Sequence, residues 1–149
     1  MWGARDMRHN IIKAIFLDAD NTLVDHSECE RQALVYLFEH IGIAYQESYR
    51  AAFNALDREL WSTNMHQGRM VTEEQIPTYR FQVLFDMFQI PYSDYKRADE
   101  LWCEGFAASV ALMPKAEEAV AALHQAGFKL CVVTTGTSRL YLSYSSGIL

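Results

Sequence analysis

Two short apolar runs stand out along a chain whose other apolar residues have helical spacing. Residues 11–17 read IIKAIFL, and residues 128–134 read FKLCVVT. Such runs are typical of strands that are buried on both faces of a parallel sheet. We therefore predict two strands of this kind, widely separated in the sequence.

Helix signals fill the region between the two runs. Ser27 and Glu30 form a capping box ahead of an apolar stripe, and Gly42 follows that stripe. Thr72 and Gln75 form a second capping box ahead of another stripe. Both patterns predict amphipathic helices.

Further helices complete this pattern. Apolar residues recur at helical spacing over 49–61, and either Ser93 or Asp94 can cap a helix that continues to about residue 106. Pro77 lies too deep for the first turn of its helix, which predicts a kink or a late start. A helix over 115–126 precedes the second strand. The order of elements is that of an α/β core with an all-helical insertion.

Composition and charge narrow the class of protein. The formal charge of −6 repels nucleic-acid polymers, so we expect no such partner. Cys29, Cys103 and Cys131 form no CxxC pair and are interpreted as isolated buried thiols in a reducing cytoplasm. No apolar segment has the length of a membrane span, and residues 1–10 lack the pattern of a signal peptide. We expect a cytoplasmic protein with no membrane partner.

The main candidate site follows the first strand, where residues 16–23 read FLDADNTL. Ligands bind open α/β sheets at the carboxyl ends of strands, and Asp18 and Asp20 can point into one crevice there. One carboxylate can attack phosphorus while the other transfers a proton, and their oxygens suit Mg²⁺. The alternative is a turn in which Asp and Asn make local hydrogen bonds. The position directly after a strand favours catalysis.

A second candidate site follows the second strand at Thr134, Thr135 and Gly136. A hydroxyl beside the backbone N–H groups of a turn and a helix start can bind a phosphoryl oxygen. An ordinary strand exit is the alternative interpretation. The position after the aspartate motif in a parallel sheet favours phosphate binding.

The segments FLDADNTL and CVVTTG together resemble the first two motifs of the haloacid dehalogenase-like (HAD) superfamily. The resemblance implies that Asp18 is a nucleophile that forms an aspartyl-phosphate, and that Asp20 is the general acid and base. It also implies Mg²⁺ held by the Asp18 side chain and the Asp20 carbonyl, with Thr134 on the phosphoryl group. Family members that cleave carbon–halogen bonds lack an acid at the position of Asp20. We therefore predict a Mg²⁺-dependent phosphomonoester hydrolase acting on a small phosphorylated metabolite.

The resemblance further implies the fold and its domains. Residues 11–25 and 107–149 are predicted to form a partial Rossmann-like HAD core of parallel strands, and residues 26–106 an inserted all-helical cap. The order of four cap segments is similar to that in bacterial pyrimidine 5′-nucleotidases, which implies nucleoside 5′-monophosphates as one substrate class: Leu60-Trp61, Gly68, Val71-Thr72 and Arg80-Phe81. By residue type alone, Trp61 and Phe81 are expected in the core and Arg80 on a solvated face.

The resemblance implies two further features after the second motif, which are not found in the sequence. One is a lysine or arginine that binds Asp18 and the phosphate, and the other is an acidic pair that completes the Mg²⁺ site. Lys115 and Lys129 precede the second motif, Arg139 follows it too closely for the later basic residue, and no acid follows Glu118. We therefore expect the sequence to be C-terminally truncated relative to the family, with an open first strand that favours self-association. An inactive relative with a binding role or none, and a phosphotransferase or mutase, are the alternatives to a phosphatase.

Overall fold

The computed structural model describes residues 13–134, and these fall into two compact units. One, which we call the α/β unit, contains residues 13–25 and 112–134. The other, the helical unit, contains residues 26–111. The assignment of the two predicted spans as core and cap domains stays a prediction.

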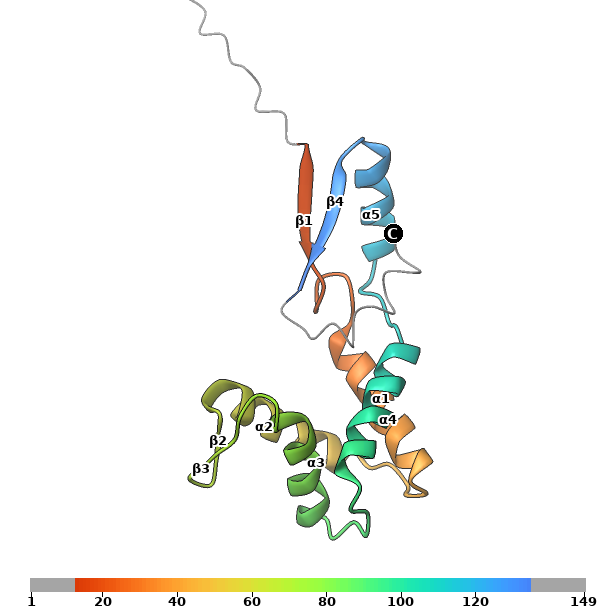
Figure 1. Cartoon of the computed structure of the whole chain (residues 1–149). Helices are drawn as coiled ribbons and strands as arrows, with labels where there is room; N and C mark the ends of the chain where they lie inside the picture. Colours follow the sequence, from red (N-terminus) through yellow and green to blue (C-terminus); the bar gives the residue numbers. More distant parts are fainter. Residues whose placement is uncertain (1–12, 135–149) are drawn as a thin grey trace, which may run out of the picture. The chain divides into compact units, whose positions relative to one another are not determined.

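The α/β unit is built on two parallel strands. β1 (Ala14–Asp18) pairs with β4 (Lys129–Val133), in a register that runs from Ala14 opposite Lys129 to Asp18 opposite Val133. The helix α5 (Ala116–Gln125) lies alongside β4 (Figure 1). Parallel strands cannot be joined by a tight turn, so the chain must return through a long crossover before β4 can form. The predicted α/β class with parallel strands is confirmed.

The prediction that both strands are buried on two faces was wrong. Residues along each strand alternate between exposed and half-buried, and the side chains of Phe16 and Val133 are 70% and 52% exposed. Within the described chain, α5 is the helix that packs on this sheet, and one helix can cover only one face. Cys131 is exposed as well, which corrects the expectation of a buried thiol there.

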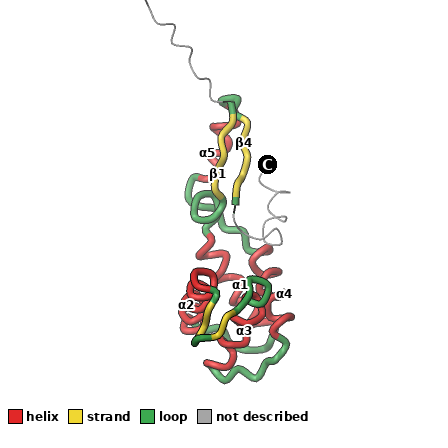
Figure 2. The backbone as a smooth tube through the Cα atoms, turned by 60° about the vertical axis from the view of Figure 1, so that its left-hand side comes forward, coloured by secondary structure: helices red, strands yellow, loops and turns green. Residues whose placement is uncertain are grey.

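The helical unit consists of four helices and a small hairpin (Figure 2). Contacts between α1 and α4 are the most extensive, and α3 packs on both α2 and α4. The helices span α1 (His26–His40), α2 (Glu47–Thr63), α3 (Ile76–Met87) and α4 (Tyr95–Ala108). The predicted block of about four helices is therefore present.

Short-range signals set several helix boundaries. The Asp94 side chain caps α4 by accepting a hydrogen bond from the Arg97 N–H at 3.0 Å, so Asp94 rather than Ser93 is the cap. Because α3 begins late, Pro77 lies in its first turn, where a missing N–H leaves no hydrogen bond unmade. α1 begins at His26, one residue before the expected cap.

The hairpin of β2 (Met65–His66) and β3 (Arg69–Met70) was not predicted. Gln67 and Gly68 form its turn with φ of 47° and 77°, and positive φ at both central residues matches the twist of paired strands. Asn64, with φ of 53°, ends α2 directly ahead of β2.

Aromatic side chains make up much of the core of the helical unit. Phe81 is fully buried, as expected, but Trp61 is 46% exposed, so its placement in the core was wrong. Neighbouring rings in the core lie in tilted contact, for example Phe53 and Phe81 with centroids 5.5 Å apart. The fully buried phenylalanines are Phe38, Phe53, Phe81, Phe85 and Phe106.

Arg80 lies inside this core and not on the solvated face that its residue type predicted. Its guanidinium donates hydrogen bonds to Asp57 at 2.8 Å and to Asp99 at 3.0 Å. The guanidinium carbon also lies 4.4 Å from the centroid of the Trp102 ring. Two carboxylates and an aromatic face offset the desolvation that a buried cation otherwise suffers. The side chain therefore links three helices.

We predict that Gly105→Ala destabilises the helical unit. A Cβ at this position would lie 2.7 Å from the Cβ of Tyr36 and 3.0 Å from the Cα of Ala33, so α1 and α4 would have to move apart. Overpacking costs about 1–3 kcal/mol, against a gain of up to about 1 kcal/mol from helix propensity. Thermal unfolding should show a lower Tm.

The control for this prediction is Lys96→Ala on the same helix, whose side chain is 83% exposed. It should leave the Tm within about 2 °C of the wild-type value. If Gly105→Ala melted at or above the wild-type temperature, the close approach of the two helices would not limit stability.

Candidate active site

The strand register brings two predicted site residues to the same edge of the sheet. Asp18 is the last residue of β1 and pairs with Val133, and Thr134 follows Val133 directly. Neighbouring strands lie about 4.8 Å apart, so both residues are at adjacent carboxyl ends. Asp18 is exposed, and Thr134 is half-buried. Thr135 and Gly136 lie outside the described residues.

The loop after β1 is compact because one carbonyl gathers several backbone donors. The Ala19 carbonyl accepts hydrogen bonds from the N–H groups of Leu23 and Val24, each at 2.9 Å. Asn21 has the left-handed φ of 56°, and its N–H donates to the Val24 carbonyl at 2.7 Å. Ala19, Leu23 and Val24 are buried. This loop therefore holds Asp20 at a fixed place after Asp18.

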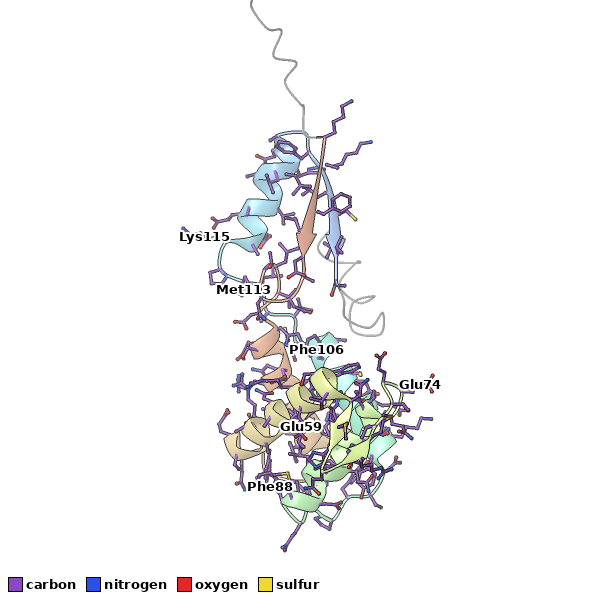
Figure 3. The ribbon with its side chains drawn as sticks, turned by 90° about the vertical axis from the view of Figure 1, so that its left-hand side faces the viewer. Glu59, Glu74, Phe88, Phe106, Met113 and Lys115 are labelled. Carbon is purple, nitrogen blue, oxygen red and sulfur yellow. The ribbon has the colours of Figure 1, made fainter. Side chains whose placement is uncertain are left out.

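A segment from far along the chain fastens this loop. Val24 forms isolated β-bridges with Asp20 and with Leu112. The Met113 N–H donates to the Leu23 carbonyl at 2.9 Å, just before α5 begins beyond Lys115 (Figure 3). Sequence patterns gave no signal for these contacts, because they join irregular segments without a side-chain motif. They pair the loop's backbone groups with protein rather than water.

Thr22 is a further residue of the site that the sequence interpretation did not single out. Its hydroxyl donates a hydrogen bond to Asp18 Oδ2 at 3.2 Å. The contact orients the Asp18 carboxylate, and its signal in the sequence was the threonine four residues further on in FLDADNTL. A local hydrogen bond of this kind also occurs in ordinary turns. The geometry is compatible with both interpretations of the motif.

The described residues fit one part of a magnesium site. The Asp18 carboxylate and the Asp20 carbonyl are hard oxygen donors on one ordered loop, which is the donor chemistry that Mg²⁺ prefers. Among residues 13–134, no group of three or more His, Cys, Asp or Glu side chains gathers to hold a metal ion. Water and a substrate phosphate would have to complete the coordination shell.

A family model supports the HAD resemblance of the two motifs. The model described as a haloacid dehalogenase-like hydrolase matches residues 12–143, which is most of the chain. The chain belongs to the haloacid dehalogenase-like hydrolase family. The matched span includes both strands, the loop after β1 and the whole helical unit.

Several solved structures share the fold of this chain. The HAD-hydrolase YfnB from Bacillus subtilis, bound to magnesium, aligns with 93% of this chain and 61% of its own, at a TM-score of 0.75 and 23% identity. A dehalogenase aligns with 92% of this chain and 57% of its own, at a TM-score of 0.58 and 14% identity. A predicted phosphoglycolate phosphatase from Haemophilus somnus 129PT aligns with 92% of this chain and 58% of its own, at a TM-score of 0.54 and 16% identity.

These similarities concern the fold, because identity is low in each case. The chain spans about three fifths of the length of the three similar structures. No functionally curated protein matches the chain. None of the helices in the described ranges is long and apolar enough to cross a membrane. The partial HAD fold with a helical insertion is thus established.

We predict that Asn21→Val loosens the loop that carries the aspartates. A β-branched residue in the left-handed conformation of Asn21 is strained by about 1–2 kcal/mol. Hydrogen exchange of the Val24 amide, whose N–H is bonded to the Ala19 carbonyl, should accelerate roughly tenfold. Asn21→Gly is the control, because glycine adopts this conformation without strain, and should exchange as the wild type does. Equal exchange in the two variants would show that the loop does not depend on this conformation.

Proposed function

We propose that the chain provides the nucleophile and the general acid of a Mg²⁺-dependent phosphomonoester hydrolase. The observation that carries this proposal is the meeting of Asp18 and Thr134 at adjacent carboxyl ends of two parallel strands, in a chain of the HAD-like hydrolase family. An acid at position 20 supports a substrate whose leaving group needs a proton, which a halide does not. A cytoplasmic location belongs to the same proposal.

The proposed reaction proceeds in two displacements. A carboxylate oxygen of Asp18 attacks phosphorus, the ester P–O bond breaks, and Asp20 gives its proton to the departing alkoxide. Water then attacks the phosphorus of the aspartyl-phosphate and passes a proton to Asp20 as the bond to Asp18 breaks. The products are an alcohol and inorganic phosphate, and both carboxyl groups return to their starting states.

The remaining residues bind and orient the phosphoryl group. The Thr134 hydroxyl is proposed to donate a hydrogen bond to a phosphoryl oxygen, and the sequence predicts the same role for Thr135 and Gly136. Asp18 and the Asp20 carbonyl would hold Mg²⁺, which when bound neutralises charge on the phosphoryl oxygens. Thr22 keeps the Asp18 carboxylate oriented through its hydrogen bond to Oδ2.

The proposed substrate is a small phosphorylated metabolite. Nucleoside 5′-monophosphates are a narrower class within it, supported by the cap resemblance. Equal kcat/KM for a nucleoside 5′-monophosphate and a sugar phosphate would remove the narrower class.

We predict distinct effects of removing each aspartate, in an active form of the protein that contains this chain. Asp18→Asn should lower kcat for nitrophenyl phosphate by roughly 10⁴-fold or more, because the covalent route is lost. Asp20→Asn should cost roughly 10²–10⁴-fold with an alkyl phosphate and much less with nitrophenyl phosphate, whose leaving group needs no acid. Steady-state kinetics with both substrates measures the difference.

Asp86→Asn is the matched control, since Asp86 is an exposed carboxylate in the helical unit. It should leave both activities unchanged. Wild-type turnover by Asp18→Asn would show that Asp18 is not the nucleophile. Equal losses on the two substrates in Asp20→Asn would remove the role of proton donor while leaving the nucleophile in place.

We predict that Mg²⁺ binds the 149-residue chain weakly, at roughly millimolar concentration, because residues 13–134 bring no group of three or more His, Cys, Asp or Glu side chains together. Isothermal titration calorimetry should detect this binding in the wild type and in Asp86→Asn, and lose it in Asp18→Asn. Tight binding that survives Asp18→Asn would place the metal elsewhere in the chain. This test does not depend on turnover.

A further inference from the structure

Within residues 13–134, the chain passes between the two units twice, after Asp25 and after Ala111. Within the α/β unit, the two crossings are joined to each other. Val24 forms a β-bridge with Leu112, and the Leu23 carbonyl accepts a hydrogen bond from the Met113 N–H at 2.9 Å. On this side, both crossings therefore begin from one fixed point.

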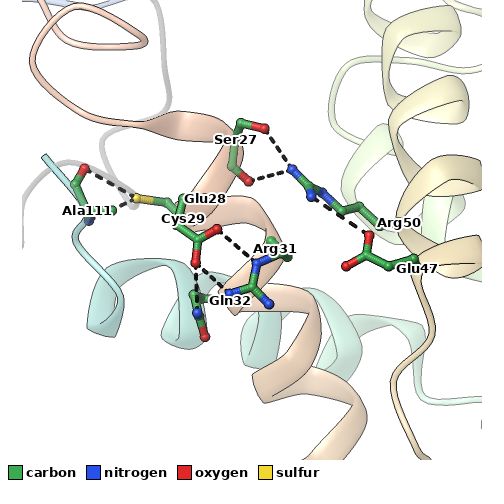
Figure 4. Close-up of polar contacts among 8 residues, drawn as sticks. All are labelled: Ser27, Glu28, Cys29, Arg31, Gln32, Glu47, Arg50 and Ala111. Atoms are coloured by element: carbon green, nitrogen blue, oxygen red, sulfur yellow. Dashed lines mark hydrogen bonds and ion pairs between the residues drawn. The ribbon is translucent and has the colours of Figure 1, made fainter. Parts of the chain in front are cut away.

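The helical unit fastens the first crossing through Arg50. Its guanidinium donates to the Ser27 carbonyl at 3.0 Å and to the Ser27 hydroxyl at 2.7 Å (Figure 4). The same guanidinium lies 3.8 Å from a carboxylate oxygen of Glu47. The start of α1 is thereby tied to the start of α2.

The helical unit fastens the second crossing through a thiol. Cys29 Sγ accepts a hydrogen bond from the Ala111 N–H at 3.3 Å and donates one to the Ala111 carbonyl at 3.9 Å (Figure 4). Ala111 lies beyond the end of α4 at Ala108, where no helix ladder can pair its backbone groups. Both of its backbone polar groups are thus directed at one sulfur.

These two bonds matter because the thiol is sealed from solvent. Cys29 is 0% exposed, so water cannot enter to replace a broken bond to its sulfur. A thiol is a weak donor and a weak acceptor, but an unmade bond in a dry place costs more than the bond itself contributes. Without Cys29, Ala111 would lose these two hydrogen bonds to α1.

We propose that Cys29 is a clamp that confines bending between the two units to the Asp25–His26 and Ala111–Leu112 links. The fixed points on either side of the second crossing, Ala111 and Leu112, are consecutive residues, so a single peptide link separates them. Without the clamp, the segment that can bend would extend from Leu112 back to the end of α4 at Ala108. The two crossings would then bend independently instead of as one hinge.

The test is hydrogen exchange of the Ala111 amide in the full 149-residue chain. Alanine and serine have nearly equal side-chain volume, but only the serine of Cys29→Ser can donate and accept hydrogen bonds with the Ala111 backbone. Exchange should accelerate roughly tenfold or more in Cys29→Ala and stay within about threefold of the wild type in Cys29→Ser. Amides of α2 and α3 provide the internal reference, and Cys103→Ala is the cysteine control.

Each remaining outcome counts against the proposal. Equal acceleration in Cys29→Ala and Cys29→Ser would mean that the sulfur only fills space. An Ala111 amide that exchanges freely in the wild type would overturn the clamp without any variant. Where Cys29→Ala fails to fold, Cys29→Val replaces it, because valine keeps apolar volume and lacks the hydrogen bonds. Protection of Ala111 in that variant would also refute the role of the thiol.

Discussion

The candidate site depends on the parallel pairing of β1 with β4. This ladder places Asp18 beside the strand end that leads to Thr134, although most of the described chain lies between the two residues. Parallel strands require a crossover, and the crossover contains the entire helical unit as well as α5. The site therefore forms only if the contacts that bring the chain back to β1 are made, and the bridge between Val24 and Leu112 is one of them.

The helical unit supports this return because it has a core of its own. Its fully buried phenylalanines belong to α1, α2, α3 and α4, so each helix buries an apolar face against the others. Arg80 adds a polar link, since its two aspartate partners come from the helices on either side of it in the packing. Breaking such a buried pair by removing one partner is strongly destabilising, because a charge is left uncompensated. An insertion with its own core can hold its two ends at fixed positions.

The sequence predicted the features that depend on a few neighbouring residues. A cap at Ser93 or Asp94 and a kink or late helix start at Pro77 depend on residues within one turn of helix, and the structure selects Asp94 and the late start. The position of Asp18 follows from a motif at the end of a strand. The surroundings of Arg80 and Trp61 depend on residues from other helices, so residue type alone predicted both wrongly. Strand burial failed for the same reason, since an apolar run does not reveal how many layers cover it. The fastening of the loop to residues 112–113 involves only backbone groups and has no sequence signature.

The neighbouring ends of the helical unit have a consequence for how the chain can change. Residues 24 and 112 bridge on one side of the junction, and Cys29 contacts Ala111 on the other, so entry and exit lie next to each other. Whatever is inserted between such points needs only to begin and end close together. The strand pair with its aspartates can thus keep one geometry while the inserted segment varies in length, composition and surface. In this arrangement the strand pair and the inserted helices are encoded by separable stretches of gene.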